Sequence, residues 1–158
     1  MIQIEEIEIQ NFRGIRDLKL KMGRKPYAIQ GPNGSGKSGV IDAIEFGLTG
    51  NLTRLSGEGS RDLSIAKHGP HIDFVDDPKS ASVTLTVWLP ALNKAVTITR
   101  TVKQKSKPKF SPNDADVADI LSNVAKHPEI ALSRREITRF VLCDATKRAT
   151  HVQELLRL

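Results

Sequence analysis

Residues 31–38 read GPNGSGKS and fit the eight-residue pattern G-x-x-x-x-G-K-[ST]. A short apolar stretch, residues 27–29, comes directly before them, and residues 40–48 carry apolar side chains at helical spacing after them. A strand that passes through a glycine-rich turn into a helix is the context in which this pattern holds a phosphate. The sequence therefore predicts an α/β fold organised around a phosphate-binding loop, or P-loop.

Each position of the predicted P-loop has a chemical reason. Successive backbone N–H groups form a nest for an anion, and Gly34 and Gly36 let the backbone come close to it. Lys37 supplies a cation for the β- and γ-phosphates, and the Ser38 hydroxyl is a ligand for Mg²⁺. The helix that begins near Lys37 adds the partial positive charge of its N-terminus. We expect ATP and Mg²⁺ as cofactors, Lys37 as the catalytic residue, and a cofactor-binding set made of Gly31, Pro32, Asn33, Gly34, Ser35, Gly36, Lys37, Ser38 and Gly39.

Length and composition narrow the class of protein. The chain has 158 residues, which suits one domain, and we expect residues 1–158 to form a single one. The net charge of +6 is compatible with a polyanionic partner, and a solvated basic surface explains it equally well. The single cysteine, Cys143, excludes an internal disulfide and fits a reducing compartment. No apolar run could span a bilayer and the first residues are not a signal peptide, so we expect a cytoplasmic protein without a membrane partner.

Alternating apolar residues predict antiparallel strands on both sides of the P-loop. Residues 2–9 and 15–22 form a predicted hairpin, with a turn between them and a bulge where the double acid Glu5-Glu6 breaks the alternation. Residues 82–89 and 95–102 form a second predicted pair of strands. The expected architecture is an α/β P-loop lobe with an antiparallel β-subdomain.

Helical spacing and polar composition assign the other segments. Asp42 and Glu45 fall on the polar side of the helix after the P-loop and are expected to point away from the core. Residues 51–62 predict a surface loop, and residues 103–113 predict a disordered or mobile one. C-terminal helices are predicted over three stretches, residues 114–125, 133–142 and 145–158.

The flanks of the P-loop resemble one class of nucleotide-binding proteins. The stretches IEEIEIQNFRGIRDLKLKM and YAIQGPNGSGKSGVIDAIEFGLTG resemble the SMC and RecF-like branch of ABC-type ATPases. That branch includes a repair ATPase that works with a nuclease. Its members open with a hairpin whose turn reads N-F-R, which stands here at residues 11–13. The resemblance implies that Arg13 lies near the nucleotide phosphates, and Arg13 therefore joins the expected cofactor-binding set.

The same resemblance implies that this chain is half of an ATPase head. In such proteins the carboxylates of the Walker B strand and the signature motif lie in a C-terminal lobe, beyond a long coiled coil. Complete heads form homodimers around ATP and act on DNA, which places them with the nucleoid in the cytoplasm. We therefore expect an N-terminal ATP-binding lobe that needs a C-terminal lobe for hydrolysis. Residues 134–137 match the family's Q-loop region, and Arg135 occupies the place of its glutamine.

Two segments imitate other ATPase motifs. Residues 55–59 look like the ABC signature, but they follow the P-loop helix and are interpreted as a loop. Residues 140–144 look like a Walker B strand that ends in Asp144, but no glutamate follows and the flanks are helical in pattern, so they are interpreted as helical core. The alternative is a self-contained small P-loop kinase or NTPase that uses Asp144. A third hypothesis is an interaction module that keeps the nucleotide as a structural support.

Basic residues gather in two places outside the P-loop, within residues 103–109 and on the C-terminal helices. Either group suits a phosphate backbone without sequence readout, and the lysine-rich segment suits a solvated surface slightly better. Binding of DNA is therefore expected mainly from the resemblance and would be independent of sequence. The four histidines and the single cysteine are scattered, so no metal-ligand spacing is present. The basic group on the predicted C-terminal helices consists of Arg134, Arg135, Arg139, Lys147 and Arg148.

Overall fold

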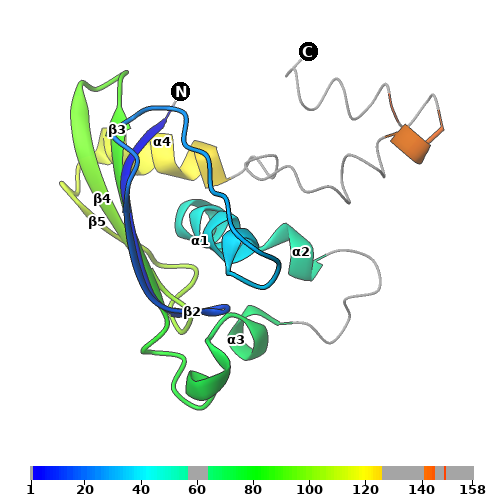
Figure 1. The fold of residues 1–158 in the computed structure, drawn as a ribbon. Coiled ribbons are helices and arrows are strands. Elements are labelled where there is room, and N and C mark those ends of the chain that lie inside the picture. The colour runs from blue at the N-terminus through cyan, green and yellow to red at the C-terminus, as the bar shows by residue number, and fades with distance from the viewer. Residues whose placement is uncertain (1, 57–63, 126–140, 145–147, 149–158) are drawn as a thin grey trace.

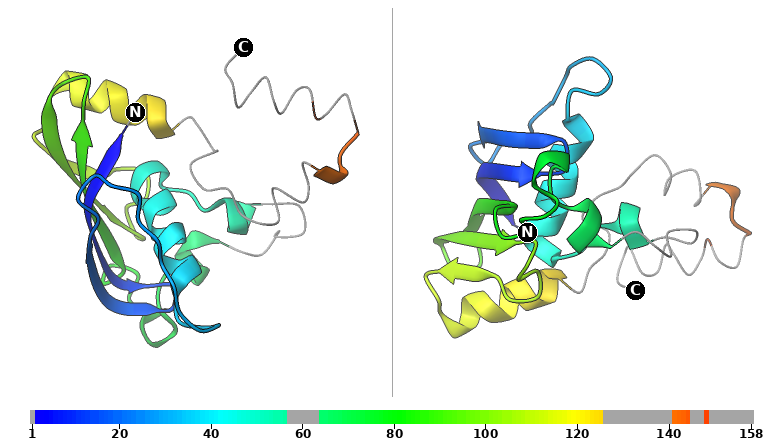
Figure 2. Two further views of the ribbon diagram at one scale, coloured as in Figure 1. Left: turned by 45° about the horizontal axis from the view of Figure 1, so that its top comes forward. Right: turned by 90° about the horizontal axis from the view of Figure 1, so that it is seen from below.

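The computed structural model describes residues 2–56, 64–125, 141–144 and 148. Its centre is a five-stranded sheet in the order β2-β1-β3-β4-β5, in which every neighbouring pair is antiparallel (Figure 1). Helix α1 lies against one face of the sheet, and α4 packs beside α1 near β5 (Figure 2). The strands are β1 (Gln3–Phe12), β2 (Ile15–Lys21), β3 (Ser82–Leu89), β4 (Lys94–Thr101) and β5 (Lys109–Ser111). The longer helices are α1 (Lys37–Thr49) and α4 (Ala115–Ala125), and the short ones are α2 (Thr53–Ser56), α3 (Ile65–His68) and the 3₁₀ turn η1 (Ile72–Phe74).

The sheet follows the alternation of apolar residues in the sequence. Ile7 and Ile9 of β1 and alternate residues of β3 are buried against α1, while the residues between them are only partly covered. The register between β1 and β3 shifts between Ile4 and Glu6, which is the bulge expected at the double acid. The predicted strands at 2–9, 15–22, 82–89 and 95–102 are thus all present.

Helix α1 approaches the sheet closely because small and aromatic residues face it. A Cβ placed on Gly47 would lie 2.6 Å from Leu85 Cδ1, so only glycine allows this spacing. The Phe46 ring stacks on Phe12 with 4.9 Å between ring centroids. Gly50 ends the helix in the left-handed conformation, with φ 75°. The packing of α1 fixes the position of the P-loop that precedes it.

The buried Arg100 of β4 holds the other end of α1. Its side chain donates to the carbonyl oxygens of Gly47 and Leu48, each at 3.2 Å, and to that of Lys105. A cation at a helix C-terminus satisfies carbonyls that have no partner within the helix. Burial lowers the pKa of Arg100 to about 10, so the guanidinium stays charged at neutral pH.

Several expectations for the loops are wrong. Residues 27–29 form no strand, because within the described part of the chain no strand pairs with them, and they are mostly exposed. The predicted loop 51–62 contains helix α2, which is anchored to α1 by the hydrogen bond from the Thr53 N–H to the Glu45 side chain. The predicted mobile segment 103–113 contains a turn and β5, because Phe110 pairs with Ile98 and packs against the core.

The helical C-terminal part is confirmed only where it is described. Helix α4 matches the expected helix 114–125 and buries Val117 and Leu121. Val141 and Leu142 are helical, but their side chains are 60% and 78% exposed, so these two residues are not the core that the sequence indicated. The remaining parts of the predicted helices 133–142 and 145–158 lie outside the described residues, apart from Arg148.

Candidate functional site

A cavity of about 710 Å³ opens at the N-terminus of α1. Four segments that are distant in sequence line it: residues 33–39 of the predicted P-loop, the β1–β2 turn, α2, and residues 67–75. Arg13, Lys37, Arg54 and Lys67 are among its lining residues. The cavity therefore combines the start of a helix with several cations, which is the arrangement that an anion requires.

The backbone of the predicted P-loop adopts conformations that glycine permits. Gly34 and Gly36 have φ values of 85° and 86°, in the left-handed region. A Cβ on Gly31 would lie 2.8 Å from the Ser35 hydroxyl, and one on Gly39 would lie 3.2 Å from Ile15 Cδ1. The loop is thus tightly turned against the β1–β2 hairpin, and these two glycines leave room that larger residues would fill.

Lys37 folds back onto the loop that carries it. Its ammonium donates to the carbonyl oxygens of Gly31 at 2.7 Å and of Pro32 at 2.6 Å. Ser38 follows at the start of α1, with its side chain exposed. Pro32 and Asn33 are exposed as well. The loop therefore has a fixed cation at its centre and a hydroxyl at its rim.

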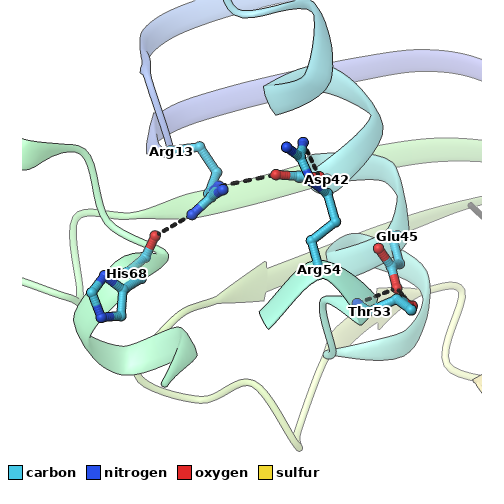
Figure 3. Close-up of polar contacts among 6 residues, drawn as sticks. All are labelled: Arg13, Asp42, Glu45, Thr53, Arg54 and His68. Atoms are coloured by element: carbon cyan, nitrogen blue, oxygen red, sulfur yellow. Dashed lines mark hydrogen bonds and ion pairs between the residues drawn. The ribbon is translucent and has the colours of Figure 1, made fainter. Parts of the chain in front are cut away.

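Arg13 lies between the P-loop helix and the segment after α3. Its backbone is left-handed, with φ 55°, and its N–H donates to the carbonyl oxygen of Gly69 at 2.7 Å. Its guanidinium donates through Nε to Asp42 at 3.0 Å and through Nη1 to the carbonyl oxygen of His68 at 2.9 Å (Figure 3). Arg13 lines the same cavity as the P-loop. Its expected position near nucleotide phosphates stays a prediction.

Two acidic residues of α1 are buried, which contradicts the expectation that they point away from the core. Asp42 is 2% exposed and Glu45 is 3% exposed. Asp42 pairs with Arg13 and, at 3.4 Å, with Nη1 of Arg54. Glu45 accepts hydrogen bonds from the backbone N–H of Thr53, at 2.7 Å, and from its hydroxyl (Figure 3). The polar side of α1 is covered by α2 and the β1–β2 turn, and the sequence pattern gave no sign of these partners.

Other candidate residues are not brought to the cavity or are not described. Arg134, Arg135, Arg139 and Lys147 lie outside the described residues, as do positions 57–59 of the signature-like segment. Asp144 is described, but Val141 and Leu142 before it are helical, which contradicts a Walker B strand at this place. No cluster of three or more metal-ligating side chains is found among the residues that the structure describes. In that same part of the chain, no helix is both long and apolar enough to cross a membrane.

The glycine-rich loop, the helix that follows it and the antiparallel sheet define an α/β lobe with the P-loop NTPase fold. Residues 6–156 match the model of a family described as an AAA domain, and the chain belongs to that family. It is 48% identical over 48 residues to the chromosome partition protein Smc of Methanocaldococcus jannaschii. The aligned stretch covers 30% of this chain and 4% of that protein. It is also 30% identical over 83 residues to the DNA replication and repair protein RecF of Acholeplasma laidlawii. This second aligned stretch covers 52% of this chain and 24% of that protein.

The fold has a solved counterpart. A chain from a study of ATP-driven dimerization and DNA-stimulated activation of SMC ATPases superimposes with a TM-score of 0.63 at 20% identity. The match covers 97% of this chain and 99% of the other. A probable ATPase of an Escherichia coli retron is 33% identical over 69 residues, 42% of this chain and 13% of that protein. The resemblance to an N-terminal lobe of the SMC and RecF-like branch is thus confirmed, while the chain spans less than a quarter of the length of the curated relatives it matches.

Proposed function

We propose that this chain binds ATP with Mg²⁺ at residues 31–38 and forms the N-terminal half of an ATPase head that works in DNA repair or chromosome maintenance. The observation that carries the proposal is the cavity in which residues 33–38 of the P-loop, the N-terminus of α1 and Arg13 meet. We take residues 1–158 as one folding unit, and we propose that a coiled coil joins the two lobes in the full-length protein.

Lys37 and Ser38 have the central roles in this proposal. When nucleotide binds, the Lys37 ammonium would leave the carbonyl oxygens of Gly31 and Pro32 and contact the β- and γ-phosphates. There it would neutralise the negative charge that develops as the γ-phosphoryl group is transferred. The exposed Ser38 hydroxyl fits a Mg²⁺ ion that arrives with the nucleotide. Such an ion would neutralise part of the negative charge on the phosphates.

Hydrolysis requires groups that the described residues do not supply. A carboxylate must hold the metal and another must orient water, yet Asp42, the one carboxylate among the described residues that line the cavity, is paired with two arginines. We assign these missing groups to a C-terminal lobe of the same protein.

A segment outside the sheet supports the binding of such a lobe. Residues 27–30 have no regular secondary structure, Tyr27 and Ile29 line a cavity of about 360 Å³, and no strand pairs with this segment within the described residues. Tyr27 and Ile41, which line that cavity, are 49% and 46% exposed. Backbone groups next to apolar side chains are what an added strand needs. A strand of the C-terminal lobe would pair with residues 27–30 here.

Dimerisation and DNA binding are the remaining parts of the proposal. The solved chain with this fold comes from work on ATP-driven dimerization and DNA-stimulated activation of SMC ATPases, and we propose a head homodimer that forms on ATP. The turn that holds Lys103, Lys105 and Lys107 is exposed and suits a duplex backbone without sequence readout. A nuclease partner and association with the nucleoid in the cytoplasm belong to the same proposal.

Nucleotide binding and turnover on this chain test the proposal, with Lys37→Ala and Asp144→Ala measured alongside. The exposed Lys25→Ala is the matched control, because it removes a cation outside the cavity. We expect ATP binding that only Lys37→Ala abolishes, with negligible turnover in every variant. Robust turnover that Asp144→Ala abolishes would instead establish a self-contained P-loop enzyme. Equal ATP binding by Lys37→Ala and the parent chain would refute the site.

A further inference from the structure

Asp42 is a buried carboxylate beside a site that we assign to a polyanion. It lies one helical turn after Ser38 on α1, lines the same cavity as the P-loop, and is 2% exposed. A negative charge at this place repels phosphate, and burial itself is costly. Solubility therefore does not explain why a carboxylate is buried at this position.

The reason lies in the two arginines that Asp42 holds. Arg13 reaches it from the β1–β2 turn and Arg54 reaches it from α2, at opposite oxygens of the carboxylate. The three groups sum to one net positive charge at the cavity wall. A guanidinium has five N–H donors, and Arg13 uses two of its donors and Arg54 one in the contacts described here. Both side chains thus keep N–H groups for another acceptor, and both line the cavity.

The two contacts differ in strength. The Arg13 contact measures 3.0 Å, and that side chain is 25% exposed. The Arg54 contact measures 3.4 Å, and that side chain is 46% exposed. A longer contact with a more exposed partner is worth less and is exchanged more readily. Arg54 is therefore the arginine that can turn from Asp42 toward a bound phosphate while Arg13 stays in place.

We propose that Asp42 is a positioning residue that orients Arg13 and Arg54 toward the nucleotide phosphates, with Arg54 as the arginine that responds to the nucleotide. The inference rests on the proposed function, since it concerns the same site. A role confined to holding α2 is already filled, because Glu45 bonds both the N–H and the hydroxyl of Thr53 at the start of that helix. The start of α2 is thus held by contacts other than the Asp42–Arg54 pair.

The substitution Asp42→Asn separates positioning from simple charge. It keeps the shape of the side chain and removes the negative charge. If Asp42 contributes only charge, its neutralisation strengthens ATP binding, because the cavity becomes more positive. If Asp42 orients the arginines, ATP affinity falls, roughly tenfold, because charge-assisted hydrogen bonds to phosphate are lost.

A double-mutant cycle of Asp42→Asn with Arg54→Met gives the decisive measurement. ATP affinity is measured for the parent, both single variants and the double variant, with the melting temperature of each as the check on folding. We expect Arg54→Met to weaken ATP binding, and Asp42→Asn to cost less in its presence than alone, because the two side chains act as one unit. Arg54→Met changes an exposed side chain, so it stays informative if Asp42→Asn does not fold.

The outcomes are distinct. Unchanged or tighter ATP binding by folded Asp42→Asn overturns the inference, as does unchanged binding by Arg54→Met. Fully additive effects in the cycle overturn the coupling between the two residues. Failure of the parent chain to bind ATP at all would count against the proposed function instead.

Discussion

The Lys37 ammonium lies 2.6 Å from the carbonyl oxygen of Pro32, within the loop that precedes its own helix. These contacts are made at the surface and hold no core residue in place. We therefore predict that Lys37→Ala lowers ATP affinity roughly a hundredfold, because a cation–phosphate contact is lost. The melting temperature should stay within a few degrees of the parent, since the change is superficial.

Calorimetric titration with ATP and Mg²⁺ measures the affinity, and thermal unfolding measures the stability. Lys25→Ala serves as the control because that lysine is equally a surface cation but lies outside the cavity. A large loss of stability in Lys37→Ala would show that the contacts of its ammonium hold the fold together.

The contact between α1 and β3 depends on Gly47. A methyl group there meets the buried Leu85 Cδ1 at 2.6 Å and Val83 Cγ1 at 3.2 Å. We predict that Gly47→Ala destabilises the protein by about 1–3 kcal/mol through overpacking, as measured by urea unfolding. Gly14→Ala is the control: a Cβ on Gly14 has no neighbour within 4 Å, so its free energy of unfolding should change little. Equal stability of both variants would mean that α1 lies farther from the sheet.

Arg100 links β4 to the end of α1 through the carbonyl oxygens of Gly47 and Leu48, for which the described residues provide no other hydrogen-bond donor. Removing the guanidinium with Arg100→Leu leaves these buried acceptors unsatisfied, and we predict a loss of about 2–4 kcal/mol in the free energy of unfolding. Arg16→Leu removes an exposed ion pair with Asp73 and should cost no more than about 1 kcal/mol. Denaturant unfolding of the two variants compares them directly. A similar cost in both would show that Arg100 is not a cap.

The pKa of Arg100 gives this cap a pH dependence with a definite sign. Its folded-state value is about 10, below the ordinary value, because burial disfavours the charge. The unfolded chain therefore binds more protons between pH 10 and the ordinary arginine value, and the contribution of Arg100 to stability rises with pH in that window. At neutral pH the group is charged in both states, so the stability difference between the parent and Arg100→Leu should not depend on pH between 6 and 8.

Features set by neighbours in sequence could be predicted, and features set by distant neighbours could not. The P-loop pattern and the alternation in β1 and β3 are local, and the structure has both the tightly turned loop and the strands. Asp42 and Glu45 were expected on an exposed face, because a helical pattern cannot show that α2 and the β1–β2 turn cover it. The partners that bury these acids lie up to 29 residues away.

The errors over the loops have the same origin. Residues 27–29 have the composition of a strand, but pairing needs a neighbouring strand, and within the described residues none is adjacent. Conversely, the lysines and prolines of residues 103–113 indicated a mobile segment, while Phe110 pairs with Ile98 and makes part of it a strand. The composition of a segment shows how polar it is, but strand pairing depends on whether another strand lies next to the segment in the fold.

The exposed turn after β4 allows a direct test of DNA binding. Lys103, Lys105 and Lys107 project from a turn, and each phosphate contact that is lost should reduce the salt dependence of binding by about 0.9 in log–log slope. We predict that Lys→Gln changes at all three positions weaken binding to duplexes of any sequence alike and lower the slope by about 2–3. Fluorescence anisotropy with two unrelated duplexes over a range of salt concentrations measures both effects.

The control carries Lys21→Gln, Lys25→Gln and Lys79→Gln, which remove the same charge from exposed positions elsewhere. If the two triple variants lose the same affinity, the effect is net charge alone and the turn is not the contact surface.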